Sequence, residues 1–168
     1  IAISVPEGTT VLEAAKMLNI NIPTLCYLKD INEIGACRMC LVEIKGARAL
    51  QASCVYPVAE GIEVYTNSEL VRKTRKTNLE LLLSDHNREC TSCVRSENCE
   101  LQKLAKDLGI KEIPFEGAKS SNIVEVNQGI VRDESKCIFC KRCIAVCSKV
   151  QGLGALGAAG RGFTAKAR

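Results

Sequence analysis

The sequence predicts an α+β protein built from three small parts rather than from one large domain. Short strand-like stretches surround a single helical stretch in the first 67 residues, and longer amphipathic stretches follow. The 11 cysteines fall into three separate groups along the chain. A length of 168 residues suits either one ordinary domain or two or three small ones.

Residues 1–67 predict several strands around one short helix. Ile1, Ile3 and Val5 alternate with smaller residues, as in a half-buried strand. Thr10 and Glu13 fit a capping box at the start of a helix over residues 11–18. A long loop then runs to about residue 40, and three more strands are predicted over 41–45, 48–54 and 62–66, the first two joined by a turn at Gly46.

Helices dominate the next part of the chain. Ser68 fits the cap of a helix over 69–84, whose partly apolar face is predicted to contain Leu70, Val71, Thr74, Asn78, Leu81 and Leu82. The opposite face is predicted to be solvated and contains Arg72, Lys73, Arg75 and Lys76. A further helix is expected over 99–108, ended by Gly109, and a strand over 123–126.

Composition narrows the class of protein. No run approaches the about 18 apolar residues that a membrane span needs. The first residues do not resemble a secretory signal, so we expect a cytoplasmic protein without membrane insertion. Thiols stay reduced in that compartment, and an odd cysteine count also argues against a disulfide framework. The spacing of the cysteines therefore becomes the main source of information.

The first cysteine group is built around a Cys-x2-Cys pair in the predicted loop and contains Cys26, Cys37, Cys40 and Cys54. Four thiolates can hold two bridged irons, with two sulfurs on each iron. Ten residues separate the first two cysteines, where plant-type ferredoxins have about four. The pattern predicts a variant [2Fe–2S] site, with a zinc site or buried apolar cysteines as the alternatives.

The second group combines the single histidine of the chain with three cysteines: His86, Cys90, Cys93 and Cys99. A lone histidine is usually structural, but this one supplies the fourth ligand that the three cysteines lack. The set predicts a [4Fe–4S] cluster, and a neutral imidazole in place of a thiolate would favour its reduced state. A structural zinc site with three cysteines and one histidine is the alternative.

The third group has the spacing of a bacterial ferredoxin and contains Cys137, Cys140, Cys143 and Cys147. This spacing predicts a [4Fe–4S] cluster. Cys147 either completes this cluster or is a ligand of a further one, as the fourth cysteine is in two-cluster ferredoxins. Ser148 stands where a proline often follows, and no second run of this kind occurs before Arg168.

Two other features invite a different function. The stretch Gly152–Gly157 matches G-x-G-x-x-G, but it lacks the strand, helix and acidic residue that a dinucleotide site requires, so we interpret it as a turn-rich hairpin. Residues 136–168 contain seven basic and no acidic residues, which is also typical of a nucleic-acid-binding tail. We expect no catalytic residue, since no P-loop, Ser/His/Asp set or paired-carboxylate site is present.

The sequence around the three groups resembles the N-terminal iron–sulfur arm shared by FeFe hydrogenases, the large iron–sulfur subunit of complex I, NAD-linked formate dehydrogenases and diaphorase subunits of NAD-reducing hydrogenases. The resemblance covers essentially the whole chain. It includes GACRMCLVE at 35–43, QASCVYPV at 51–58, NLELLLSDHNREC at 78–90, NCELQ at 98–102 and CIFCKRCIAVC at 137–147. The last stretch is most similar to multisubunit, NAD(P)-linked FeFe hydrogenases.

This resemblance implies a β-grasp [2Fe–2S] ferredoxin domain over 1–67, a helical His-Cys [4Fe–4S] domain over 68–122, and part of a bacterial-type ferredoxin domain over 123–168. In the family, Cys147 would be a ligand of a second cubane. The downstream cysteines of a hydrogen-activating cluster are not in this sequence. The chain is therefore interpreted as a fragment, or as the ordered part of a longer subunit.

The resemblance further implies a relay of single electrons between a flavin-bearing NAD(P)H partner and a hydrogen-converting site. The implied partners are a flavin- and NAD(P)-binding iron–sulfur subunit and a small ferredoxin-like subunit, with no nucleic acid. Complex I or formate dehydrogenase could be the host of the same relay. A zinc-stabilised nucleic-acid-binding module is the remaining alternative.

Overall fold

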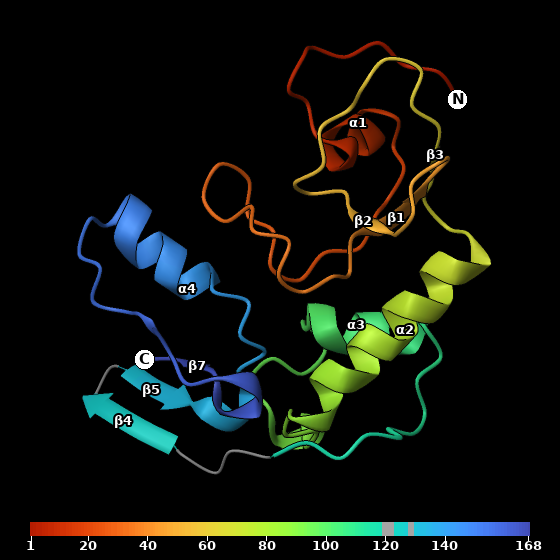
Figure 1. Ribbon diagram of the computed structural model, residues 1–168. Helices are drawn as coiled ribbons and strands as arrows, with labels where there is room; N and C mark the ends of the chain where they lie inside the picture. The colour runs from red at the N-terminus through yellow and green to blue at the C-terminus, as the bar shows by residue number, and fades with distance from the viewer. Residues whose placement is uncertain (119–122, 128–129) are drawn as a thin grey trace. The chain divides into compact units, whose positions relative to one another are not determined.

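The computed structural model describes residues 1–118, 123–127 and 130–168, and it divides into two compact units, Ile1–Asn78 and Leu79–Arg168 (Figure 1). The mixture of helices and small sheets confirms the α+β class at this level. The finer division at residues 67 and 122 stays a prediction, and its second boundary lies outside the described residues.

The first unit combines one short helix, α1 (Val11–Met17), with a three-stranded antiparallel sheet (Figure 1). The sheet has the order β2 (Gln51–Ala52), β1 (Leu41–Ile44), β3 (Val64–Tyr65). β1 pairs Leu41 with Ala52 on one side and Glu43 with Tyr65 on the other. The strands are shorter than predicted, while the turn at Gly46 is confirmed by its φ of +82°.

Helix α1 begins at the predicted cap. The Thr10 hydroxyl accepts a hydrogen bond from the Glu13 amide at 3.3 Å. Only this half of the capping box forms, because the Glu13 carboxylate accepts hydrogen bonds from Lys16 Nζ at 2.8 Å and from the Tyr27 hydroxyl at 2.5 Å. The carboxylate thereby ties the helix to the loop that contains the first cysteine.

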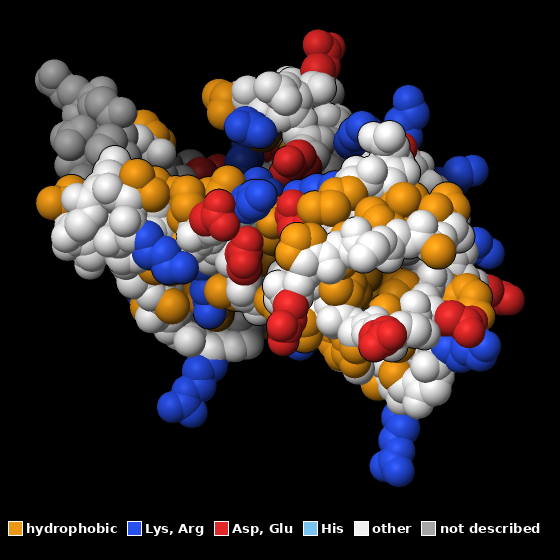
Figure 2. Space-filling model, turned by 90° about the horizontal axis from the view of Figure 1, so that it is seen from above, with side chains coloured by type: hydrophobic (Ala, Val, Ile, Leu, Met, Phe, Trp, Pro, Cys, Tyr) orange, Lys and Arg blue, Asp and Glu red, His pale blue; other side chains and the backbone are white. Residues whose placement is uncertain are grey.

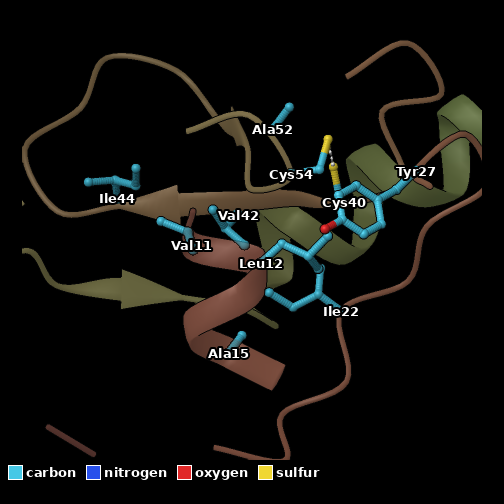
Figure 3. Packing of buried hydrophobic residues seen from close by; sticks show 10 residues of the cluster. All are labelled: Val11, Leu12, Ala15, Ile22, Tyr27, Cys40, Val42, Ile44, Ala52 and Cys54. Carbon is cyan, nitrogen blue, oxygen red and sulfur yellow. Dashed lines mark hydrogen bonds between the residues drawn. The ribbon is translucent and has the colours of Figure 1, made fainter. Parts of the chain in front are cut away.

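The core of the first unit lies between α1 and β1 (Figure 3). Apolar residues of the helix, such as Leu12, pack against the inward face of the strand, where Val42 is fully buried. Two cysteines of the first group, Cys40 and Cys54, belong to the same cluster of buried side chains. The hydrophobic core and the first cysteine group are therefore one continuous packing unit.

The predicted strand at the start of the chain is wrong. Residues 1–5 form no strand, and the side chain of Ile1 is 98% exposed. Alternation of apolar residues favours a strand only where a partner is within reach. Both edges of β1 are already occupied, one by β2 and the other by β3.

Helix α2 (Glu69–Ser84) confirms the predicted helix and its cap, since the Ser68 hydroxyl accepts a hydrogen bond from the Val71 amide at 3.3 Å. Its predicted faces are partly wrong. Apart from Ser84 at its end, the buried positions follow a four-residue spacing along one stripe: Val71, Arg75, Leu79 and Leu83. Leu70 and Leu81, predicted on the apolar face, are 54% and 42% exposed, whereas Arg75, predicted on the solvated face, is buried.

The second unit is made of short elements joined by turns. After the 3-10 turn η1 (Cys90–Ser92), α3 (Glu100–Asp107) ends as predicted, with Gly109 at a φ of +63°. β4 (Ile123–Asn127) confirms the predicted strand and pairs with β5 (Ile130–Asp133). The remaining elements are η2 (Glu134–Lys136), α4 (Arg142–Ala145), the π-helical turn η3 (Val146–Val150), η4 (Gly162–Thr164) and the paired strands β6 (Ala158–Ala159) and β7 (Lys166–Ala167).

None of the helices within the described residues is long and apolar enough to span a membrane.

We predict that Tyr27→Phe destabilises the first unit, because it removes the hydroxyl that donates to the Glu13 carboxylate. A hydrogen bond to a charged group contributes about 1.5 kcal/mol or more. In a double-mutant cycle with Glu13→Gln, measured by urea unfolding at neutral pH, the coupling free energy should be about 1–2 kcal/mol.

Tyr65→Phe is the matched control. The Tyr65 hydroxyl also donates to a glutamate, Glu63, but at 3.5 Å and on an exposed side chain. Its removal should change the free energy of unfolding by no more than about 0.5 kcal/mol. Equal losses for the two tyrosine variants would contradict the role given to Tyr27.

Candidate metal centres

The first cysteine group is brought together as two pairs of sulfurs. Cys40 Sγ lies 3.4 Å from Cys54 Sγ in the buried core (Figure 3). Cys26 and Cys37 form the second pair, in which the Cys37 amide also donates to Cys26 Sγ at 3.5 Å. A [2Fe–2S] cluster takes two sulfurs on each iron, so two close sulfur pairs fit its donor set.

The backbone around α1 places Cys54. The Val11 and Leu12 amides at the start of the helix have no partner inside the helix. They donate to the carbonyls of Tyr56 and Ser53, at 2.9 and 3.0 Å. Ser53 in turn donates to the Cys40 carbonyl through its amide at 3.1 Å and its hydroxyl at 2.8 Å. The two sulfurs therefore face each other because their own backbones are hydrogen-bonded.

Hydrogen bonds favour the thiolate form of one cysteine in each pair. The pKa of Cys37 is lowered because the Cys26 thiol and the backbone amides of Met39 and Leu25 donate to it, with Leu25 N at 3.4 Å from the sulfur. The pKa of Cys40 is lowered because the Cys54 thiol donates to it. Thiolates are the form that binds iron. The same hydrogen bonds raise the pKa of the donor thiols Cys26 and Cys54, so one sulfur of each pair is favoured as the thiolate.

Left-handed backbone conformations concentrate beside the cysteines. Among the described residues, non-glycine residues with positive φ include Arg38 at +55°, Phe139 at +51° and Lys141 at +62°. Gly35, two residues before the Cys-x2-Cys pair, has a φ of +59°, a left-handed conformation that glycine adopts without steric cost. Alternating right- and left-handed residues form concave nests of amides that bind anions, including iron–sulfur centres. The left-handed residues beside Cys37 and Cys140 supply one of the two conformations that such a nest needs.

The second group occupies the turn after α2 and the start of α3. Cys90 begins η1, the Cys93 amide donates to the Cys90 carbonyl at 3.1 Å, and Cys99 is the cap residue of α3. Among the described residues, no hydrogen bond joins these three sulfurs to one another or to the imidazole of His86. Each iron of a four-iron cluster takes one protein ligand, so a cubane needs ligands held apart rather than in pairs.

His86 has the properties expected of a metal ligand. Its Nδ1 is buried and has no hydrogen-bond partner, and burial lowers the pKa of the imidazole, which favours the neutral form. A buried polar atom without a partner costs about 1–3 kcal/mol, so its presence calls for an explanation. A neutral imidazole nitrogen that binds iron would remove this cost.

A buried ion pair fixes the segment next to His86. Lys166 Nζ lies 2.8 Å from Asp85 Oδ2, and the lysine side chain is only 3% exposed. The Asn87 amide donates to the Ser135 carbonyl at 2.8 Å on the other side of the histidine. Strand β7 and the turn before Cys137 therefore hold the residues on both sides of His86.

The third group surrounds helix α4. Cys137 directly follows η2, and Cys143 lies in the first turn of α4. The pKa of Cys143 is raised by partial burial of its thiol and by the nearby charges of Cys140 and Cys137. Cys147 is buried in the following turn, η3.

A buried carboxylate supports the start of this group. Glu134 is 3% exposed, and Arg168 Nε and Arg132 Nη2 lie 3.2 and 3.6 Å from its Oε1. The Cys137 amide donates to the Glu134 carbonyl at 3.2 Å. The glutamate thus connects β5, the end of β7 and the first cysteine of the group.

The glycine-rich stretch after Cys147 is not a dinucleotide site. A π-helical turn precedes Gly152–Gly157, and the two-residue strand β6 follows it, in place of the strand before and helix after that the motif requires.

The possible metal ligands in the described residues do not form a compact site for a single ion. Within the described residues, no three His, Cys, Asp or Glu side chains gather closely enough to hold one metal ion. This part of the chain therefore offers no preformed tetrahedral site of the kind that structural zinc uses.

Sequence reasoning missed Arg75. Its guanidinium Nη2 donates to the Leu41 carbonyl at 2.6 Å, directly after the ligand candidate Cys40. The sequence contains a signal for its burial, because Arg75 lies four residues from both Val71 and Leu79 in the buried stripe of α2. Arg75 is predicted to face solvent when only its charge is considered, whereas its position on the helix predicts burial.

Two protein families match separate parts of the chain. Residues 1–69 match a 2Fe-2S iron-sulfur cluster binding domain, and residues 75–114 match the NADH-ubiquinone oxidoreductase-G iron-sulfur binding region. These matches confirm a [2Fe–2S] ferredoxin-type domain followed by a [4Fe–4S] region.

Whole-chain comparisons agree with the family matches. The chain is 48% identical over 96% of its length to the NADP-reducing hydrogenase subunit HndD of Solidesulfovibrio fructosivorans, covering 29% of that protein. It is 39% identical over 96% of its length to the second G-type subunit of the NADH-quinone oxidoreductase of Rhizobium meliloti (strain 1021), covering 19% of it. A crystal structure of an NAD+-reducing [NiFe]-hydrogenase in the H2-reduced state aligns with 98% of the chain and 69% of its own, at a TM-score of 0.88 and 34% identity.

The fold, the cysteine loops and these matches define an iron–sulfur protein. The chain belongs to the family of iron–sulfur arms that NAD(P)-linked hydrogenases share with NADH-quinone oxidoreductase, which confirms the resemblance stated above. The chain spans less than a third of the curated relatives it matches.

We predict that Lys166→Met destabilises the second unit, because it leaves the Asp85 carboxylate without its buried partner. Breaking a buried ion pair costs about 3–5 kcal/mol, and the 17% exposure of the Asp85 side chain reduces this to about 2–3 kcal/mol. Urea unfolding measures the loss, with Lys45→Met as the control. Lys45 pairs with Glu63 at 2.7 Å but is 63% exposed, so a loss as large as that of Lys166→Met would contradict the assignment.

Proposed function

We propose that the chain is an electron-relay segment that holds three iron–sulfur clusters for a larger oxidoreductase. The observation that carries this proposal is the pairing of sulfurs in the first group. Cys40 Sγ and Cys54 Sγ lie 3.4 Å apart, and backbone amides point at the sulfur of Cys37 in the second pair. The clusters, when bound, would supply one-electron transfer. The residues supply ligands, exclude water and set the local charge.

The proposed ligands follow the three groups. The [2Fe–2S] cluster is held by Cys26, Cys37, Cys40 and Cys54. One [4Fe–4S] cluster is held by His86, Cys90, Cys93 and Cys99, and a second by Cys137, Cys140 and Cys143. Cys147 is either its fourth ligand or a ligand of a further [4Fe–4S] cluster in a longer protein. The burial and unpartnered Nδ1 of His86 support its inclusion.

The finer fold is proposed with the ligands. One helix packed on a small sheet, with the first cysteines in the loop between them, supports a β-grasp domain in the first unit. The regular spacing from Cys137 to Cys147 and the turn of α4 support a partial bacterial-type ferredoxin domain at the other end.

The host that we favour is a multisubunit, NAD(P)-linked FeFe hydrogenase in the cytoplasm. The identity to the NADP-reducing hydrogenase subunit is the support for this host, with complex I or formate dehydrogenase as the alternatives. The chain would pass electrons between a flavin- and NAD(P)-binding subunit, or a small ferredoxin-like subunit, and the hydrogen-converting site. We expect no catalytic residue within these 168 positions.

The basic tail does not favour a nucleic-acid-binding module. Lys166 pairs with Asp85, Arg168 with Glu134, and Arg142 with Glu100 at 3.0 Å. Figure 2 shows a face on which blue Lys and Arg side chains and red Asp and Glu side chains both occur. A surface that binds phosphates needs uncompensated cations gathered on one face.

Metal and sulfide analysis tests the proposal directly. The purified holoprotein should contain about ten irons and a similar amount of acid-labile sulfide per chain, given one two-iron and two four-iron clusters. Inductively coupled plasma mass spectrometry and a sulfide assay give both values. Stoichiometric zinc without visible absorption, together with salt-dependent binding to DNA or RNA, would instead support the nucleic-acid module.

The role of His86 has its own test. His86→Ala should change or abolish one [4Fe–4S] signal in electron paramagnetic resonance and leave the [2Fe–2S] signal intact, since only the second site loses a ligand. His86→Cys is the matched variant, because a thiolate restores a ligand and should retain four irons with an altered signal. Spectra that are identical for all three proteins would show that His86 is not a ligand.

A further inference from the structure

Arg75 is a buried cation beside the first cysteine group. Its side chain is 5% exposed, and its Nη2 donates to the Leu41 carbonyl at 2.6 Å. Leu41 begins β1 and directly follows Cys40, which is 1% exposed. Helix α2 thus places a guanidinium group on the backbone of the residue that directly follows a proposed [2Fe–2S] ligand.

The charge of Arg75 has no carboxylate partner in the part of the chain that the structure describes. None of the ion pairs there includes Arg75, and its buried Nε has no hydrogen-bond partner. Arginine stays protonated in proteins, so burial leaves a positive charge that the single hydrogen bond to the Leu41 carbonyl offsets only in part and that a nearby anion would stabilise further. Burial lowers the pKa of the guanidinium, and the nearby charge of Cys40 acts in the opposite direction.

We infer that Arg75 is the electrostatic partner of the cluster held by Cys26, Cys37, Cys40 and Cys54, and that it raises the reduction potential of that cluster. This inference rests on the proposed function, because it requires a [2Fe–2S] cluster at the first group. Thiolate ligands make the site anionic, and reduction adds one more negative charge. A fixed cation close to the site therefore stabilises the reduced form more than the oxidised form.

Simple packing does not explain an arginine at position 75. A methionine would fill similar space on the stripe between Val71 and Leu79, and it would avoid the desolvation cost of a buried charge that has no carboxylate partner among the described residues. An arginine kept at this position without a carboxylate therefore needs a reason other than stability. The anionic cluster next to Cys40 supplies that reason.

The test is a redox titration of the holoprotein with sodium dithionite, following the [2Fe–2S] signal by electron paramagnetic resonance. Arg75→Met should shift the reduction equilibrium at least tenfold toward the oxidised form, which corresponds to about 59 mV for a one-electron couple. Arg75→Lys keeps the charge and should shift the equilibrium less than threefold. The signals of the two [4Fe–4S] clusters should titrate as in the unmodified protein.

Lys73→Met is the matched control, since it removes a positive charge from the exposed face of the same helix. Its shift should be less than threefold because solvent screens exposed charges. Equal shifts for Lys73→Met and Arg75→Met, or an unchanged potential in Arg75→Met, would overturn the inference.

If Arg75→Met does not retain the cluster, the Arg75→Lys variant provides the test. A shift of its reduction equilibrium below threefold would support the inference, because the charge is preserved. A tenfold shift would overturn it. The two proposals fail differently. Absence of any [2Fe–2S] signal from the unmodified holoprotein contradicts the proposed function. A normal signal whose reduction potential is unchanged by the Arg75 substitutions contradicts only this inference.

Discussion

The short antiparallel pairing of β1 with β2 is the contact on which the first metal centre depends. Leu41 lies opposite Ala52 in this pairing, which brings Cys40, just before β1, next to Ser53 and Cys54, which follow β2. A shift of one residue would turn alternate side chains to the opposite face. The amides at the start of α1 and the buried Leu12 hold this register, and Arg75 adds a contact to the Leu41 carbonyl. Core, helix and ligand geometry are therefore one cooperative unit.

Local signals in the sequence predicted the features that neighbouring residues determine. Thr10 and Ser68 cap their helices, Gly109 ends α3, and the spacing of cysteines identified the groups whose family assignment the comparisons bear out. Features set by distant partners were harder to predict. Residues 1–5 have a strand pattern but pair with no strand, and Arg75 is buried and donates to Leu41, which lies 34 positions earlier in the chain. An arginine side chain is usually exposed to solvent, but tertiary packing buries this one.

The charge pattern of the chain also changes its meaning in the folded protein. A formal charge of +4, with seven basic and no acidic residues after position 135, suggested an external polyanion. In the second unit, carboxylates from earlier in the chain meet part of this charge, and one of them, Glu134, is almost fully buried beside Cys137. The pairs also fasten β7 to the segments around His86 and the third cysteine group. Basic residues of this tail therefore form ion pairs that attach it to the rest of the second unit.

The two ends of the chain build their metal loops by different means. The first group spans residues 26–54 and needs a sheet to close it, whereas the third spans eleven residues and closes through local turns. Both loops nonetheless contain left-handed non-glycine residues, Arg38 in one and Phe139 and Lys141 in the other, each costing roughly 1–3 kcal/mol. Such strain persists only where the surrounding structure or a ligand offsets it. A cluster accepting hydrogen bonds from the amides of these turns would do so, and the same amides would stabilise its negative charge.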